Sequence, residues 1–304
     1  MKVGTDFSGI GSPEMALKYL NIDFESVFAC EIDKYARQSF QQLHNPKTFY
    51  NDITTRNHKE VKQLDLYVAG FPCQSFSMAG KRKGFDEARG TLFFNVADFI
   101  KFNQPKVFVL ENVKGLLNHD KGKTFQTIVD ILSNGGGTQN GQIGFDMFDD
   151  GLGYHIYYKV LNTKDFGIPQ NRERIFIVGF KDFRDFSFPK PMELKLKLVD
   201  ILQDNPKYAL SGKFQPYPRN YKELGLKRII RFEKRENKYY LSDKSIKIRR
   251  LTPLECWRLQ GFKDEDFFSV KDVSDTQLYK QAGNSITVNV LMELFKKIYA
   301  NHNK

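Results

Sequence analysis

The sequence predicts an α/β fold built on a doubly wound, mostly parallel sheet. Over residues 2–180, short apolar runs typical of buried strands alternate with stretches of helical periodicity. After that part, FSFPKP at 186–191 marks a boundary, and a strongly basic segment begins. With 304 residues, the chain is long enough for one large domain and a second, small one.

The expected elements follow one another in order. Strands are expected at KVGTDF (2–7), ESVFACEI (25–32), LDLYVAGF (64–71), KVFVLENV (106–113), YHIYYKVLNT (154–163) and RIFIVGF (174–180), with a further strand ending at YNDIT (50–54). Helices are expected at SPEMALKYL (12–20), TLFFNVADFIKF (91–102), GKTFQTIVDILSN (122–134) and NVLMELFKKIYA (289–300). Ser12 is expected to be the N-cap of the first helix, with Pro13 in its first turn.

A capping box marks another helix start near the C-terminus. In TPLECWRLQGF (252–262), Thr252 and Glu255 have the spacing of such a box, and Gly261 follows as a stop signal. The glycine-rich segment 134–151 has neither helical nor strand periodicity and is expected to be a surface loop.

Composition excludes several classes of protein. No apolar run approaches the roughly 20 residues that span a bilayer, and the N-terminal residues lack the features of a signal peptide. The three cysteines, at 30, 73 and 256, are too few for a disulfide framework. No Cys-x-x-Cys or His-x₃-His spacing occurs, so no metal site is expected. We therefore expect a cytoplasmic protein without a membrane association.

The positive charge of the chain is concentrated in one segment. The whole chain carries a net charge of +11. Residues 186–250 contain 17 Lys and Arg against seven Asp and Glu, interleaved with Tyr and Phe. A solvated surface would explain a single basic patch, but this concentration favours a polyanionic partner.

Ligands of open α/β sheets bind at the carboxyl ends of the strands. The first expected strand ends at DFSGIGS, where Gly9 and Gly11 allow close approach of the backbone to a ligand. The next two end near Glu31 and Asp52, carboxylates suited to a nucleoside. The full G-x-G-x-x-G pattern is missing, which argues against a dinucleotide.

Two further strand ends carry reactive side chains. Cys73 follows AGFP, and Glu111 ends the run KVFVL, so both are within reach of one substrate. A cysteine is more often a small buried apolar residue, which is our interpretation of Cys30 and Cys256. Cys73 differs because the basic residues of KRK (81–83) would lower the pKa of a nearby thiol.

Five motifs in one order carry a family resemblance. They are FSGIG (7–11), GFPCQSFS (70–77), ENV (111–113), QNRER (170–174) and QAGNS (281–285). Together they resemble the DNA (cytosine-5)-methyltransferases, in particular the compact bacterial and phage enzymes. The resemblance covers the chain except for roughly 192–248. The chain departs from the family pattern at Ser12, where a glycine is usual, and at Asp6, where an apolar residue is common.

The resemblance implies a mechanism. Cytosine C5 is a poor nucleophile, and addition of the Cys73 thiolate at C6 would turn the ring into an enamine that attacks a sulfonium methyl group. Glu111 would hold the proton at N3, Arg174 would contact the base oxygen, and Arg172 would steady Glu111. Because a stacked base cannot reach Cys73, the target nucleotide would have to flip out.

The resemblance also implies the cofactor and partners. S-adenosylmethionine would be bound by Phe7, Gly9, Ile10, Gly11, Glu31, Asp52, Ile53, Asn284 and Ser285. Double-stranded DNA would be bound by Ser77, Lys81, Arg82, Lys83, Lys227, Arg228 and Arg231. A monomer associated with the nucleoid is expected, with a cognate restriction endonuclease as a separately acting partner.

The resulting domain plan has two parts. A Rossmann-like S-adenosylmethionine-dependent methyltransferase domain is expected at 1–185, completed by 280–304. A small basic target-recognition domain with its hinge is expected at 186–279. Two other interpretations stay open: the tRNA-methylating branch of the same family, and a catalytically idle DNA-binding protein on this fold.

Overall fold

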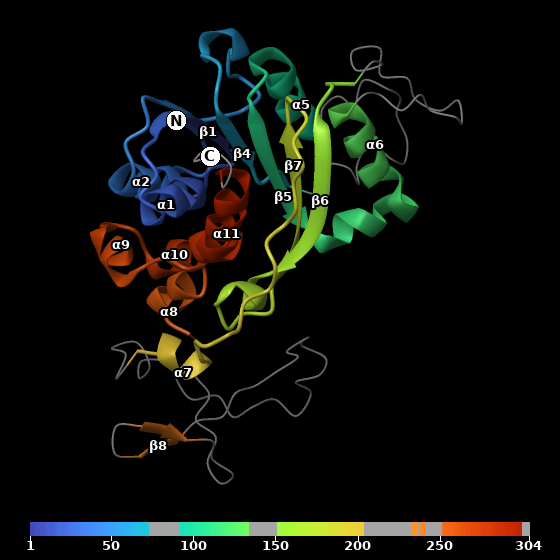
Figure 1. The fold of residues 1–304 in the computed structure, drawn as a ribbon. Coiled ribbons are helices and arrows are strands. Elements are labelled where there is room, and N and C mark those ends of the chain that lie inside the picture. The colour runs from blue at the N-terminus through green and yellow to red at the C-terminus, as the bar shows by residue number, and fades with distance from the viewer. Residues whose placement is uncertain (73–91, 134–150, 204–232, 236–237, 241–250, 300–304) are drawn as a thin grey trace.

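The computed structural model describes residues 1–72, 92–133, 151–203, 233–235, 238–240 and 251–299. In these parts, one seven-stranded sheet has the order β3-β2-β1-β4-β5-β7-β6 and helices on both faces (Figure 1). The strands are β1 (Lys2–Asp6), β2 (Glu25–Cys30), β3 (Thr48–Tyr50), β4 (Leu66–Ala69), β5 (Val107–Val113), β6 (His155–Asn162) and β7 (Glu173–Phe180). The predicted α/β architecture is confirmed.

The sheet is mixed and not purely parallel. Strands β1 to β5 pair in parallel, but β7 lies between β5 and β6 and is antiparallel to both. A parallel pair needs a long crossover, whereas β6 and β7 are joined by the short segment 163–172. The short connection therefore forces the chain to reverse, which the hydrophobic pattern of the two strands does not indicate.

Two hydrophobic cores lie on opposite faces of the sheet. On one face, α1 (Ser12–Tyr19) packs with α11 (Val288–Tyr299), and Leu17 and Leu294 are fully buried between them and the sheet. On the other face, α5 (Leu92–Asn103) and α6 (Lys123–Leu132) bury Phe99 and Ile128. These helices close the sheet on both sides and leave the carboxyl ends of its parallel strands open.

The two predicted helix starts have different outcomes. Thr252 and Glu255 form the predicted capping box of α8 (Pro253–Arg258), with the Glu255 amide donating to Thr252 Oγ1 at 3.2 Å. The N-cap of α1 is Gly11 and not Ser12, so this prediction was wrong. Gly11 has φ +82°, and a Cβ at this position would lie 2.3 Å from the His44 ring. The close approach of His44 thus makes glycine the residue that fits at the start of α1.

The C-terminal helices extend the first core. After α8 come α9 (Asp264–Ser269) and α10 (Asp275–Asn284). Trp257 is fully buried, belongs to the same core as α1 and α11, and donates its indole N–H to Leu278 O at 3.1 Å. This part of the chain therefore packs into the core beside the seven-stranded sheet, although it is distant from most of the sheet in sequence.

The remaining described elements are short. They are α2 (Lys34–Leu43), α7 (Leu198–Ile201), the 3-10 helices η1 (His58–Glu60), η2 (Lys114–Gly122) and η3 (Thr163–Phe166), and an antiparallel pair of strands, β8 (Glu233–Arg235) and β9 (Lys238–Tyr240). Most of the basic segment and the 134–151 segment lie outside the described residues. Within the described parts, no helix has the length and apolar character needed to cross a membrane.

Candidate active site

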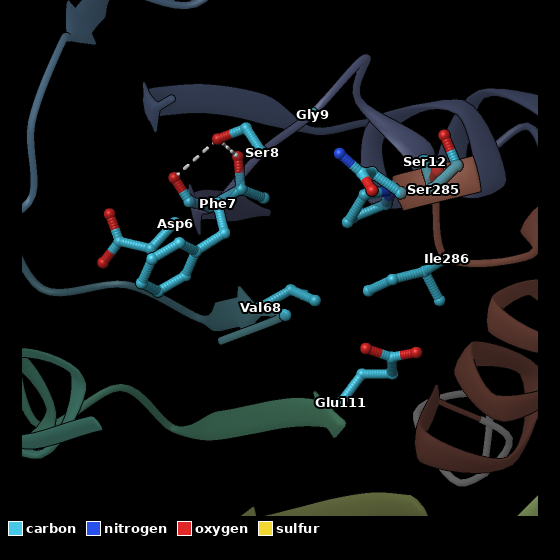
Figure 2. Close-up of a pocket in the computed structure, with 13 residues that line it drawn as sticks. Asp6, Phe7, Ser8, Gly9, Ser12, Val68, Glu111, Ser285 and Ile286 are labelled. Atoms are coloured by element: carbon cyan, nitrogen blue, oxygen red, sulfur yellow. Dashed lines mark hydrogen bonds between the residues drawn. The ribbon is translucent and has the colours of Figure 1, made fainter. Parts of the chain in front are cut away.

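A cavity opens at the carboxyl ends of β1, β2, β4 and β5. Its volume is about 350 Å³. The described residues that line it are Phe7, Gly9, Glu31, Asp33, Ala36, Gly70, Phe71, Pro72, Glu111, Asn112, Val113, Arg172, Arg174, Lys280, Gln281, Gly283 and Asn284. A narrower chamber of about 40 Å³ adjoins it, with Ser12, Ser285 and Ile286 in its wall (Figure 2). The predicted position of the ligand site, at the strand ends, is the position of this cavity.

The turn after β1 forms one wall. Phe7 and Gly9 both have left-handed backbone conformations, with φ of +52° and +56°. Ser8 fastens the turn: its hydroxyl donates to Thr5 O at 2.9 Å and accepts from the Cys30 amide at 2.9 Å. A Cβ added at Gly9 would meet no atom within 4 Å, so open space lies directly over this residue.

Glu31 stands beside this turn at the end of β2. Its Oε2 accepts from the Gly9 amide at 2.9 Å, and its Oε1 accepts from the Asp33 amide at 2.8 Å. The carboxylate is therefore fixed in the cavity wall. Ile32, which follows it, exposes 73% of its surface although it is a large apolar residue.

The segment after β3 lies away from the walls of the two cavities. Asp52 caps its own turn, with Oδ1 accepting from the amide and the hydroxyl of Thr54, each at 2.8 Å. Ile53 is buried. Neither Asp52 nor Ile53 is among the described residues that line the two cavities. Their expected contact with a cofactor stays a prediction.

Glu111 supplies a buried acid at the floor of the site. Its Oε1 forms an ion pair with Nε of Arg174 at 3.1 Å, and its side chain is only 11% exposed. Figure 2 shows the carboxylate directed from β5 toward Val68 and Ile286. Burial raises the pKa of the Glu111 carboxyl, and the charges of Arg174 and Arg172 offset that rise only in part. The Glu111 carboxyl therefore keeps its proton to a higher pH than an exposed glutamate does.

Arg172 and Arg174 contact different groups, and their contacts differ from those that the family resemblance implies. Arg174, and not Arg172, makes the direct contact with Glu111. Arg172 donates from Nη2 to Gly283 O at 3.1 Å and to Ser285 O at 2.9 Å. Because β7 begins at Glu173, Arg172 precedes the strand and binds carbonyl groups at the end of α10. Burial and the neighbouring Arg174 lower the pKa of Arg172 to about 10.

The QAGNS motif lies at the end of α10 and returns to the cavity. Asn284 lines both chambers, and the buried Ser285 donates its hydroxyl to Gln281 O at 2.8 Å. Three hydrogen bonds join α10 to α2 and its N-cap: Lys280 Nζ to Asp33 Oδ2 at 2.5 Å, Gln281 Nε2 to Tyr35 O at 3.0 Å, and Ser39 Oγ to Gln281 Oε1 at 3.2 Å. Sequence reasoning missed Lys280 and Asp33, because a single Lys and a single Asp carry no signal until the two helices meet.

Several predicted site residues lie outside the described part of the chain. They are Cys73, Ser77, Lys81, Arg82, Lys83, Lys227, Arg228 and Arg231. The chain is nevertheless held up to Pro72: Asn112 Nδ2 donates to Phe71 O at 2.8 Å, and Phe71 and Pro72 line the cavity. Cys30, by contrast, is buried, and burial raises the pKa of its thiol, which makes it a poor nucleophile.

The described residues offer no metal centre, since they contain no group of three or more His, Cys, Asp or Glu that would hold an ion. The site instead combines a glycine-containing turn, a fixed carboxylate at Glu31, and a protonatable Glu111 next to two guanidinium groups. Such a set can bind a nucleoside and place a proton donor against a second, planar ligand.

Comparisons with known proteins agree with these features. The family model for the C-5 cytosine-specific DNA methylase matches residues 1–246 and 219–300. The chain is 38% identical over 316 residues to the type II methyltransferase M.NlaX of Neisseria lactamica, covering 97% of this chain and 95% of that protein. It is 38% identical over 315 residues to the type II methyltransferase M.NgoBI of Neisseria gonorrhoeae, covering 96% and 90%. Among solved structures, the methyltransferase EhMeth of Entamoeba histolytica has a similar fold, with a TM-score of 0.70 at 18% identity over 100% of this chain and 99% of that one.

Proposed function

The chain belongs to the C-5 cytosine-specific DNA methylase family, and from this membership we propose that it methylates C5 of a cytosine within a specific duplex DNA sequence. The observation that supports the proposal best is the ion pair between the buried Glu111 and the partly exposed Arg174, which faces the cavity next to the β1 turn. A protonatable carboxyl paired with a guanidinium matches the N3 and O2 edge of a cytosine. The base would reach this pair after flipping out of the duplex.

We assign the covalent step to Cys73. Its thiolate would add to C6 of the ring, which makes C5 nucleophilic. After C5 has taken the methyl group, a base would remove the C5 proton, and the C6–S bond would break to release the thiolate and restore the ring. Glu111 would donate its proton to N3 while the thiolate adds, so that negative charge does not build up on the ring. The raised pKa of the Glu111 carboxyl supports this role, because the acid must be protonated when the base arrives.

The cavity fits S-adenosylmethionine, which supplies the methyl group when bound. The open space over Gly9 lets backbone approach a ligand closely, and the fixed Glu31 carboxylate offers acceptors for ribose hydroxyls. Asn284 and Ser285 close the other side of the site. Phe7, Ile10, Gly11, Asp52 and Ile53 complete the proposed cofactor-binding set.

We propose that the basic segment supplies much of the DNA affinity and lies in a small target-recognition domain within 186–279. The domain at 1–185, completed by 280–304, would carry out the chemistry as a monomer, and Trp257 of the 186–279 part packs into the core of that domain. Because the similar proteins are named type II methyltransferases, we further propose a restriction endonuclease as a separate partner. The enzyme would act in the cytoplasm on DNA of the nucleoid.

Bisulfite sequencing of DNA from cells that express the protein tests the activity and reports the target at once. We expect methylated cytosines in one recurring sequence, and none in cells that express Cys73→Ser. Cys256→Ala is the matched control and should retain methylation if the protein folds. Purified enzyme with labelled S-adenosylmethionine should methylate duplex DNA and not tRNA. Label in tRNA alone, or a normal rate in Cys73→Ser, would refute the proposal.

A further inference from the structure

A buried ion pair lies behind the cavity. Asp6 is the last residue of β1, and Arg56 lies in the segment that follows β3. The pair is bidentate, with Arg56 Nη1 at 2.5 Å from Asp6 Oδ1 and Nη2 at 2.7 Å from Oδ2. Tyr67 donates its hydroxyl to the same Oδ2 at 2.5 Å. Both charged side chains are 0% exposed.

Aromatic rings enclose the guanidinium. Arg56 Cζ lies 4.3 Å from the ring centroid of Phe99 and 4.5 Å from that of Phe28. Burial disfavours the charge, but the charge and the hydrogen bonds of Asp6 together outweigh burial and raise the pKa of Arg56, so the guanidinium stays charged. Burying two charges requires their removal from water, which costs free energy. Apolar side chains of the same volume often stabilise a core as well or better, so stability alone is a weak reason for such a pair. A role in holding defined positions is the alternative.

The pair joins two segments that are distant in sequence: the end of β1, whose next residue Phe7 lines the cavity, and the segment after β3, to which the proposed function assigns cofactor contacts. Asp6 directly precedes Phe7, whose left-handed backbone is costly for a residue with a side chain. In Figure 2 the Asp6 carboxylate points away from Ser285 and Ile286, which lie across the chamber. Arg56 closes the stretch that begins with Asp52 and Ile53. The bidentate ion pair therefore fixes the position of the end of β1 relative to the segment after β3.

We infer that the Asp6–Arg56–Tyr67 network is a positioning device for cofactor binding, which holds Phe7 and the Asp52–Ile53 segment in register. The inference rests on the proposed function. The network touches neither the base nor the reacting atoms, so its loss should weaken affinity for S-adenosylmethionine and leave the rate at saturating cofactor nearly unchanged. Loss of a residue that only stabilises the fold would not weaken cofactor affinity while leaving the rate at saturating cofactor unchanged.

Paired variants separate positioning from stability. Tyr67→Phe removes only the hydroxyl that holds Asp6. Tyr154→Phe is the matched control, because it removes an equally buried hydroxyl that donates to Pro105 O at 2.8 Å. Arg56→Lys keeps the charge and loses the bidentate geometry. The double variant Asp6→Leu with Arg56→Met replaces the pair by apolar groups, which restores packing without the fixed link.

Calorimetry with S-adenosylmethionine and S-adenosylhomocysteine measures affinity on the full chain, and thermal unfolding measures stability. We expect Arg56→Lys to raise the Kd about tenfold, which corresponds to about 1.4 kcal/mol, with kcat at saturating cofactor within about twofold of wild type. Tyr67→Phe should raise the Kd about threefold, and Tyr154→Phe should not raise it. The double variant should regain stability but keep the raised Kd.

The outcomes distinguish this inference from the proposed function. If the wild type fails to bind the cofactor or to methylate DNA, the proposed function fails. If the wild type binds and methylates, and Tyr67→Phe and Tyr154→Phe have equal Kd values, the positioning role is overturned. Recovery of both stability and affinity in the double variant would overturn it as well. If Arg56→Lys does not fold, the two tyrosine variants decide.

Discussion

Glu14 gives the sharpest test of the electrostatics around the site. It lies in α1 and is fully buried, and Thr5 Oγ1 donates to its Oε1 at 2.8 Å. Its Oε2 has no hydrogen-bond partner among the described residues. Burial raises the pKa of the Glu14 carboxyl from its ordinary 4.5 to about 7, against the smaller opposing effects of its backbone and of Thr5. The folded state therefore binds a proton that the unfolded state releases.

The sign and size of the effect follow from this difference. The stabilisation by protonated Glu14 is fully present below pH 4.5 and is lost as the pH rises through about 7. The full shift corresponds to about 3 kcal/mol, most of which falls between about pH 5 and about pH 8. Glu14→Gln cannot titrate, so relative to this variant the wild type should lose about 2–3 kcal/mol of unfolding free energy over that range.

Urea unfolding of both proteins at several pH values measures this difference. The absolute stability of Glu14→Gln does not matter, since a fixed cost from its buried amide is the same at every pH. Glu265→Gln is the matched control, because it makes the same change in a side chain that is 74% exposed. If the difference in unfolding free energy between wild type and Glu14→Gln does not change with pH, burial does not raise the pKa of this carboxyl.

Three further predictions concern catalysis, DNA affinity and the fold. Glu111→Gln should lower the single-turnover methylation rate by about 10² or more with DNA affinity nearly unchanged; an unchanged rate would remove Glu111 from the mechanism. Replacing Lys227, Arg228 and Arg231 by alanine should flatten the slope of log affinity for DNA against log salt concentration by about 0.9 for each phosphate that these side chains neutralise. Filter binding at several salt concentrations measures this slope. A slope equal to that of the wild type would show that these residues face away from DNA. Trp257→Ala should lower the free energy of unfolding in urea by about 3–5 kcal/mol, because Trp257 is fully buried in the core shared with α1 and α11. A loss below about 1 kcal/mol would contradict that packing.

Much of the fold could be predicted because its signals are local. The apolar run at 106–113 predicted β5 (Val107–Val113) to within one residue, and the run at 64–71 contains the shorter β4 (Leu66–Ala69), since hydrophobic patterning reflects burial on a sheet. The capping box at Thr252 was likewise correct, because both partners lie within one helical turn. The order of the five motifs indicated the family, and the family model matches the chain from end to end.

The same local reasoning placed several candidates at the site. Gly9, Glu31 and Glu111 all line the cavity, because the carboxyl ends of parallel strands meet at one edge of a sheet. Cys73 remains a prediction, since it lies outside the described residues. Its neighbours Phe71 and Pro72 do line the cavity.

The sequence predicted the strands of the seven-stranded sheet, the helices α1, α5, α6, α8 and α11, and the motif residues that stand at strand ends. Contacts between segments far apart in the chain became known only from the folded structure. The sequence did not determine that β7 runs antiparallel, that Arg174 rather than Arg172 contacts Glu111, or that Lys280 meets Asp33. The Asp6–Arg56 pair likewise joins positions 50 residues apart. Periodicity and capping depend on neighbours within a few residues, whereas these pairs exist only once the sheet has brought their segments together.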